Sequence, residues 1–169
     1  MISPIIFWNI RGVGTSYRRL RKIIKQFSPN IIALAEPFLL EDRIPSFLGR
    51  FSCNCFVTNE VHGGKIWLMW NSLVSIQWVA GSNQFITVKV EENGHTFLLS
   101  IIYAKCNRND RRELWADLEN MGTARIPWVL CGDFNIIKDE SERRGFGALY
   151  FGSLPVGYSN GGELIQVWS

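Results

Sequence analysis

The sequence has few cysteines and histidines, the residues that bind soft metals. It contains four cysteines and two histidines, and no two cysteines have the C-x-x-C spacing. We therefore predict that the cysteines are small, reduced core residues rather than metal ligands or disulfide partners. His62 and His95 each adjoin a glycine and have no acidic neighbour, which argues against a general-base role.

Long apolar runs are also absent. The longest run, residues 97–104, is interrupted by Ser100, and it is far shorter than the ~18 residues that a membrane helix needs. No basic region precedes the short apolar run at residues 5–8, so no secretory signal is expected. These absences predict an intracellular protein, in the nucleus or the cytoplasm, with no membrane partner.

The composition is that of one globular domain. Of the 169 residues, 47% are hydrophobic and 20% are charged, which excludes a disordered or collagen-like chain. The 18 Lys and Arg residues against 15 Asp and Glu residues give a net charge of +3 and a pI near 8.8. This mild basic bias permits a polyanionic partner but does not require one.

The order of the expected elements predicts an α/β fold with mixed sheets. Helices are expected over residues 16–27, with Ser16 as the N-cap, and over residues 110–121. The Asn93-Gly94 pair predicts a tight hairpin turn. β-branched and aromatic runs predict strands near residues 4–9, 31–35, 53–58, 65–70, 75–79, 85–90, 96–103 and 127–132.

The amino-acid composition changes near the end of the sequence. Residues 145–169 hold 6 of the 15 glycines and one charged residue, Glu163, and they show no helical or strand period. We therefore expect a domain over residues 1–144 followed by an atypical glycine-rich tail over residues 145–169.

Polar residues stand where three apolar strands are expected to end. These are Asn9, Glu36 and Asp133, with Asn135 two positions further on. Strand ends of a layered α/β protein converge at one edge, where sites form. Two carboxylates with carboxamides beside them offer the hard oxygen ligands that suit Mg²⁺. The alternative is that they are simply polar strand caps.

Other motifs carry weaker signals. Gly12-Val13-Gly14 precedes a helix, but the dinucleotide fingerprint needs a glycine where Tyr17 stands, so no nucleotide cofactor is expected. An arginine-rich segment follows Tyr103 and could hold a phosphate, or it could be a solvated helix start; it contains Asn107, Arg108, Arg111 and Arg112. The polar face of the first helix could likewise contact nucleic-acid phosphates or be merely solvated; it carries Arg18, Arg19, Arg21, Lys22 and Lys25.

Six motifs occur in an order that resembles a known superfamily. They are Trp8-Asn9-Ile10-Arg11-Gly12, Ala35-Glu36-Pro37, Gly63-Gly64, Tyr103-Ala104, Trp115 with Leu118, and Gly132-Asp133-Phe134-Asn135. The chain is similar to the endonuclease/exonuclease/phosphatase superfamily, which has the DNase I-like fold. Its likeness is greatest to the endonuclease domains of plant non-LTR (LINE-type) retrotransposons.

This resemblance implies a four-layer α/β sandwich and Mg²⁺-dependent hydrolysis of a phosphodiester in DNA, with Mn²⁺ as an alternative cation. Asn9 and Glu36 would bind the metal, and Tyr103 would contact the scissile phosphate. Asp133 would orient or deprotonate the attacking water and adjoin the metal, and Asn135 would help to hold the phosphate. These roles agree with the chemistry of metal-assisted hydrolysis.

One part of the superfamily pattern is missing. No Asp-His pair occurs anywhere in the sequence, although the superfamily ends with a serine-aspartate-histidine run. We therefore expect a C-terminally truncated domain in which part of the second sheet is missing. A catalytically silent remnant, and a phosphatase or lipid phosphodiesterase of the same superfamily, stay open as alternatives to an active DNA endonuclease.

Overall fold

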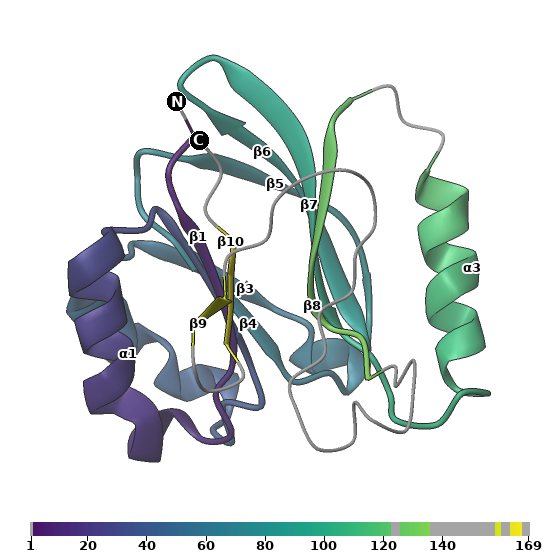
Figure 1. Cartoon of the computed structure of the whole chain (residues 1–169), viewed down its shortest axis with the longest axis horizontal. Helices are drawn as coiled ribbons and strands as arrows, with labels where there is room; N and C mark the ends of the chain where they lie inside the picture. Colours follow the sequence, from purple (N-terminus) through teal and green to yellow (C-terminus); the bar gives the residue numbers. More distant parts are fainter. Residues whose placement is uncertain (1, 123–125, 136–157, 160–162, 167–169) are drawn as a thin grey trace.

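The computed structural model describes residues 2–122, 126–135, 158–159 and 163–166. These residues form two sheets that pack face to face (Figure 1). The predicted strands are all present, with ends that agree to within a few residues. Among the described residues, no helix is both long and apolar enough to cross a membrane.

The first sheet has the strand order β3-β4-β2-β1-β10-β9. Its centre is the parallel pair β1 (Ile5–Asn9) and β2 (Ile31–Ala35), in which Asn9 is the register partner of Ala35. β4 (Ile66–Trp70) pairs antiparallel with β2, and β3 (Cys55–Thr58) forms the outer edge. All five residues of β2 are buried, as expected for a strand that is covered on both faces.

The second sheet has the order β5-β6-β7-β8. β5 (Ser75–Ser82), β6 (Phe85–Glu92) and β7 (His95–Tyr103) form an antiparallel meander, and β8 (Trp128–Asp133) pairs parallel with β7. Asn93 and Gly94 have φ angles of 50° and 78°, which confirms the tight hairpin turn between β6 and β7.

Helices cover the outer faces of both sheets, which confirms the expected four-layer sandwich (Figure 1). α1 (Val13–Phe27) buries Leu20 and Ile24 against the first sheet, and α3 (Arg111–Met121) buries Leu114 and Leu118 against the second. A third apolar cluster fills the space between the sheets and contains residues from both. Burying the apolar faces of two sheets and two helices is what makes this arrangement stable.

The expected start of the first helix was wrong. α1 begins at Val13, and the hydroxyl of Ser16 donates to the carbonyl of Ile10 at 3.2 Å instead of capping the helix. The N-cap is Gly12, with a φ of 101°, a conformation that glycine adopts at little cost. The backbone N–H groups of Gly12 and Val13 donate to the carbonyls of Glu36 and Pro37 at 2.8 and 3.0 Å. Contacts between loops therefore fix this helix start.

The segment between β2 and β3 contains short helices that no sequence period indicated. They are η1 (Glu41–Arg43), α2 (Pro45–Leu48) and η2 (Gly49–Phe51), and η3 (Glu60–His62) follows β3. The cysteine prediction holds for Cys53 and Cys131, which are buried, but not for Cys55 and Cys106, which are exposed. All four are free thiols.

The glycine-rich tail, whose sequence shows no strand period, contributes two strands to the fold. β9 (Tyr158–Ser159) pairs with β10 (Glu163–Gln166), and β10 pairs antiparallel with β1 at the centre of the first sheet. The tail boundary and the loss of strands from the second sheet stay predictions, because residues 136–157 lie outside the described part of the chain.

Candidate functional site

The predicted site residues come together at one edge of the sandwich. β1 and β2 are parallel, as are β7 and β8, so the carboxyl ends of each pair share an edge. β1 also contacts β8, and both strands run toward the lower edge in Figure 1. Asn9 ends β1, Tyr103 ends β7 and Asp133 ends β8, and Glu36 follows β2 directly.

A hydrogen bond between Asn9 and Asp133 joins the two sheets at this edge. The side-chain Nδ2 of Asn9 donates to Oδ2 of Asp133 at 3.1 Å. The opposite amide orientation would place two oxygens against each other, so the network itself fixes the orientation. As a result, Oδ1 of Asn9 is buried and has no hydrogen-bond partner among the described residues.

A second link between the sheets joins Tyr103 and Glu36. The phenolic hydroxyl of Tyr103 donates to Oε1 of Glu36. Burial raises the pKa of Tyr103 well above its usual value, and so do the hydrogen bond to Glu36 and the charges of Glu36, Asp133 and Cys106. Tyr103 therefore acts at neutral pH as a hydrogen-bond donor and not as a phenolate. Glu36 has a φ of 51°, an uncommon conformation for a residue with a side chain.

The turn after β8 positions Asp133 and Asn135. The backbone N–H of Asn135 donates to Oδ1 of Asp133 at 3.0 Å, and its Nδ2 donates to the carbonyl of Ala104 at 2.5 Å. The N–H of Ala104 donates to the carbonyl of Asp133 at 2.8 Å. Phe134, between the two polar residues, stacks on Trp115 of α3 with 6.1 Å between ring centroids and 4° between planes. Both oxygens of Asp133 thus accept hydrogen bonds, which orient the carboxylate.

These residues fit a hard divalent cation. A buried acceptor without a donor is costly by about 1–3 kcal/mol, and a cation would satisfy Oδ1 of Asn9. Mg²⁺ in proteins is usually coordinated by one or two carboxylates and several water molecules, and Glu36 and Asp133 can supply these carboxylates. The described residues contain no group of three or more His, Cys, Asp or Glu that could hold a metal. The proposed donor set includes the carboxamide of Asn9 because its buried Oδ1 has no hydrogen-bond partner within the described part of the chain.

The buried thiols are unsuited to metal binding. Burial raises the pKa of Cys131 to about 12. Burial and the neighbouring Cys55 raise the pKa of Cys53 to about 12 as well. Metal binding requires the thiolate, so both remain protonated core residues.

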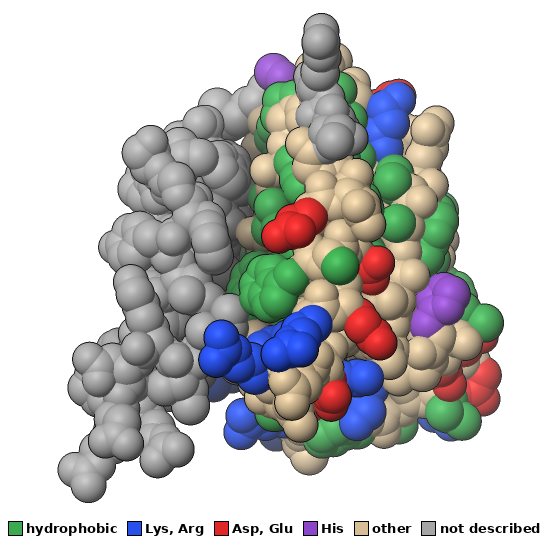
Figure 2. All heavy atoms as spheres, turned by 90° about the vertical axis from the view of Figure 1, so that its right-hand side faces the viewer, with side chains coloured by type: hydrophobic (Ala, Val, Ile, Leu, Met, Phe, Trp, Pro, Cys, Tyr) green, Lys and Arg blue, Asp and Glu red, His purple; other side chains and the backbone are tan. Residues whose placement is uncertain are grey.

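The arginine-rich segment after Tyr103 forms a loop that is held by several hydrogen bonds. Nη1 of Arg111 donates to the carbonyls of Lys105 and Cys106 at 2.8 and 2.6 Å. Buried Gln84 binds the N–H of Lys105 and the carbonyl of Asp110, both at 2.9 Å. Nη1 of Arg111 therefore helps to shape the loop, and phosphate binding by this segment stays a prediction. Lys105, Arg108 and Arg112 are exposed, and Lys and Arg side chains are grouped at the lower end of the α3 side (Figure 2).

The two histidines lie at the surface, as expected, and not among the clustered site residues. His62 stacks on Trp78 at 6.3 Å, on the edge strand farthest from β8. His95 begins β7, and Tyr103 ends it; nine residues of strand span roughly 27 Å.

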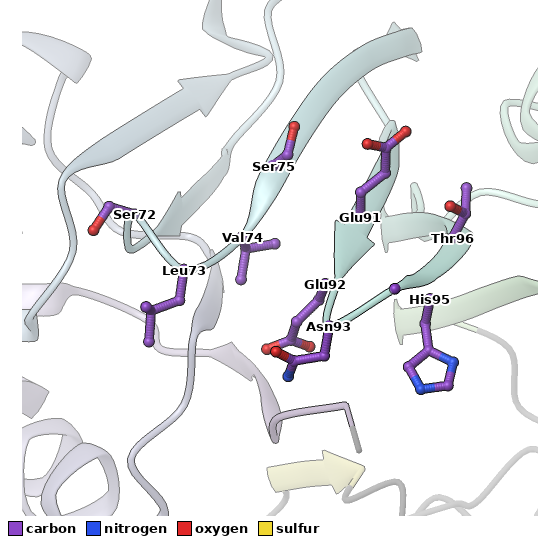
Figure 3. A pocket seen from close by; sticks show the side chains of 10 residues that line it. Ser72, Leu73, Val74, Ser75, Glu91, Glu92, Asn93, His95 and Thr96 are labelled. Atoms are coloured by element: carbon purple, nitrogen blue, oxygen red, sulfur yellow. The ribbon is translucent and has the colours of Figure 1, made fainter.

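A polar pocket of about 450 Å³ lies at the His95 end and is lined by residues 72–75 and 91–96 (Figure 3). It contains none of the predicted site residues. Its buried Glu92 accepts hydrogen bonds from the N–H of Ser3 at 3.0 Å and Nδ2 of Asn30 at 2.6 Å. These contacts join the starts of β1 and β2 to the end of β6, so this carboxylate has a structural role.

One residue beside the site was not predicted from the sequence. Phe38 is 61% exposed and lies two positions after Glu36. The available signal was three consecutive large apolar residues, Phe38-Leu39-Leu40, directly after a strand end. In the folded chain all three side chains are exposed.

Comparison with known proteins identifies the family of the chain. The model of the Endonuclease/Exonuclease/phosphatase family matches residues 6–164, so the chain belongs to this family. A comparison with curated proteins gives no match.

Solved structures of low sequence identity share the fold. A humanised *D. rerio* TDP2 is 20% identical with a TM-score of 0.62, over 85% of this chain and 70% of that one. The human Nocturnin catalytic domain, with a bound sulfate anion, is 21% identical with a TM-score of 0.56, over 86% and 70%. The *Neisseria* 3′ phosphatase NExo, bound to a product DNA hairpin, is 14% identical with a TM-score of 0.58, over 83% and 60%.

Proposed function

We propose that the chain is a Mg²⁺-dependent phosphodiester hydrolase that nicks DNA, of the type found in plant LINE-type retrotransposons. The observation that carries this proposal is the pair of hydrogen bonds, Asn9 to Asp133 and Tyr103 to Glu36, which assemble four polar side chains at one edge of the sandwich. The motif Trp8-Asn9-Ile10-Arg11-Gly12 and the basic face of α1 favour this lineage and a nucleic-acid substrate.

Glu36, Asn9 and Asp133 would hold the Mg²⁺, with Mn²⁺ as an alternative. When bound, the cation would neutralise the charge that builds up on the phosphate and leaving-group oxygens. Two structures of related fold support DNA as the substrate, because TDP2 from *D. rerio* was solved with a single-stranded DNA product and NExo with a DNA hairpin.

The chain's own residues would orient and activate a water molecule. Asp133, held through both of its oxygens by Asn9 and Asn135, accepts the proton of the attacking water. The water oxygen bonds to phosphorus as the bond to the leaving oxygen breaks, and the leaving oxygen takes up a proton from solvent. The Nδ2 of Asn135 has a second hydrogen besides the one donated to Ala104 and can donate it to a phosphate oxygen. Tyr103 can do the same once Glu36 turns from its hydroxyl.

The test is nicking of supercoiled plasmid with and without Mg²⁺. Glu36→Gln and Asp133→Asn should each lower the rate by about 100-fold or more, since each removes a charge that acts in the transition state. Glu119→Gln is the matched control, because Glu119 is an exposed carboxylate on α3 that contacts none of the site residues. Nicking that survives both site substitutions, or that persists in a chelator, would contradict the proposal.

A silent remnant is the second candidate, favoured by the position of the histidines. His62 and His95 lie away from the four joined side chains, and the sequence holds no other histidine. Wild-type nicking that does not exceed the chelator control would support this candidate. An inositol phosphate assayed in parallel identifies a phosphatase of the same family, because faster hydrolysis of that substrate than of plasmid would overturn DNA as the substrate.

A further inference from the structure

A large aromatic side chain is exposed beside the site. Phe38 is 61% exposed, and the next two residues, Leu39 and Leu40, are 39% and 66% exposed. Burying an aromatic or aliphatic side chain is favourable, so exposure of three consecutive large apolar side chains forgoes stabilisation. Exposed apolar groups that are held in a fixed place commonly mark a binding surface.

The backbone holds Phe38 in place. Its φ is 55°, a left-handed conformation that is strained for an aromatic residue and is maintained only by surrounding contacts. The N–H groups of Gly12 and Val13 bind the carbonyls of Glu36 and Pro37. A Cβ at Gly12 would lie 3.5 Å from Cδ2 of Phe38, so the ring lies close to the β1–α1 loop. Such strain occurs most often at functional sites.

The distance from Phe38 to the proposed cation site is within the length of one nucleotide. It lies two residues from Glu36, and two residues span at most about 7 Å. Gly12, against which the ring lies, is three residues from Asn9. A phosphate bound at Glu36 and Asn9 would therefore place one of its attached nucleosides within reach of the Phe38 ring.

Cations lie on both sides of the site, whereas the acidic Glu41 and Asp42 follow the exposed apolar run. Arg11, adjacent to Gly12, is exposed and has a φ of 46°. α1, which starts at the same loop, contains no acidic residue and exposes five cations. On the other side of the site, Lys105 follows Ala104, which is bonded to both Asp133 and Asn135. Cations flanking an aromatic ring are the usual composition of a surface that binds single-stranded nucleic acid.

We infer that Phe38 is a stacking platform for an unpaired nucleobase adjacent to the cleaved phosphate, so that the site selects single-stranded or locally melted DNA. This inference rests on the proposed function, because it names the substrate class of the same site. In a duplex the bases already stack on one another, whereas an unpaired base presents its face to an aromatic side chain.

The experiment couples a protein substitution to removal of a base. Binding of wild-type chain and Phe38→Ala to a fluorescent DNA oligonucleotide is measured in Ca²⁺ by anisotropy, with an abasic nucleotide moved along the strand one position at a time. A gel confirms that the strand is intact. Leu73→Ala is the matched control, since Leu73 is 72% exposed and lines the pocket at the opposite end. Phe38→Trp retains an aromatic face.

Phe38→Ala should weaken binding of the intact single strand by about 5- to 100-fold. At one abasic position the same substitution should have almost no effect, because the stacking partner is already gone. Phe38→Trp should restore the position dependence, and Leu73→Ala should leave it unchanged. Duplex binding should depend less on Phe38.

Several results would overturn the inference. One is that Phe38→Ala weakens binding equally at every abasic position. Another is that Leu73→Ala weakens binding as much as Phe38→Ala does. The third is that the wild-type chain does not bind the strand up to about 100 μM, the weak end of non-specific binding. Binding to anionic vesicles that needs Phe38, together with a flat abasic scan, would indicate a membrane surface instead. If the chain nicks plasmid but the effect of Phe38→Ala is the same at every abasic position, the stacking inference is rejected and the proposed hydrolase stands. If the effect of Phe38→Ala disappears at one abasic position but the chain does not nick plasmid, the proposed hydrolase is rejected and the stacking platform is supported.

Discussion

The side-chain amide of Asn9 donates to Oδ2 of Asp133 at 3.1 Å and joins two residues that are 124 positions apart in the sequence. Asn9 ends the first strand of one sheet, and Asp133 ends β8 of the other. The site therefore exists only when the two sheets have closed on each other. Its geometry and the packing between the sheets are expected to be gained and lost together.

Asn9→Asp should make the stability of the fold depend on a divalent cation. The substitution removes the donor to Asp133 and places two carboxylates in contact, a repulsion of about 1–4 kcal/mol. Without a cation, the Tm should fall by several degrees, and millimolar Mg²⁺ should recover most of the loss. Thermal melts with and without a chelator measure this.

The control for that prediction is Asn30→Asp, at the opposite end of the sandwich, where Asn30 donates to Glu92 at 2.6 Å. It creates a similar carboxylate contact away from the proposed cation site. Equal recovery of both variants by Mg²⁺, or recovery of neither, would contradict a cation site at Asn9.

Tyr103 should make the fold less stable at high pH. Its pKa in the folded chain is raised by burial and by Glu36, whereas in the unfolded chain it ionises near pH 10. Below about pH 10 both states hold the proton and stability is unaffected; above it the unfolded chain releases the proton first, so stability falls as the pH rises. Urea unfolding at about pH 8 and pH 11 should show a larger decrease for wild type than for Tyr103→Phe. An identical decrease would show that Tyr103 ionises alike in both states.

Much of the sandwich could be predicted from local sequence, because its strands are continuous apolar runs that end at polar residues. β2 was predicted with the observed ends, since Ile31–Ala35 is apolar throughout and is followed by Glu36-Pro37. Asn9, Glu36 and Asp133 were selected for the same reason. Parallel pairing of neighbouring strands then places such ends at one edge without further information.

The features that the sequence did not reveal depend on contacts between distant segments. α1 starts at Val13 because its first N–H groups bind the loop after β2, and no helix-capping pattern encodes such a partner. β10 belongs to the tail, and it is a strand because β1 offers it an edge. The exposure of Phe38 likewise follows from where its loop lies, not from its residue type.

The stack of Phe134 on Trp115 should position the turn that carries Asp133 and Asn135. The rings are parallel, with centroids 6.1 Å apart, so truncating Trp115 removes the support for that turn. Trp115→Ala should lower kcat for plasmid nicking by about 10- to 100-fold, because small displacements of a reacting group are costly, with a smaller effect on KM. Trp115→Phe retains an aromatic ring but lacks the indole N–H. It should restore most of the rate if the ring stack positions the turn, and it should not if a hydrogen bond from the indole N–H does so.

Trp78→Ala serves as the comparison for Trp115→Ala, because Trp78 is an exposed tryptophan on β5. Its removal should leave kcat unchanged. An equal loss of kcat in both variants, or a loss that follows only the fall in Tm, would reject a positioning role for Trp115.

Gly132 should tolerate no side chain, although it lies in a strand that is otherwise built from larger residues. It is the register partner of Ile102 in the parallel β7–β8 pair, its φ is 151°, and a Cβ there would overlap the backbone of Ile102. Gly132→Ala must push β8 away from β7 and displace Asp133, so the free energy of unfolding should fall by more than about 3 kcal/mol and activity should be lost. Gly14→Ala is the matched substitution, because nothing lies within 4 Å of its Cβ and α1 continues through it; it should stabilise the chain by about 0.5–1 kcal/mol. Urea unfolding compares the two, and a folded, active Gly132→Ala would show that the β7–β8 pair does not require this close approach.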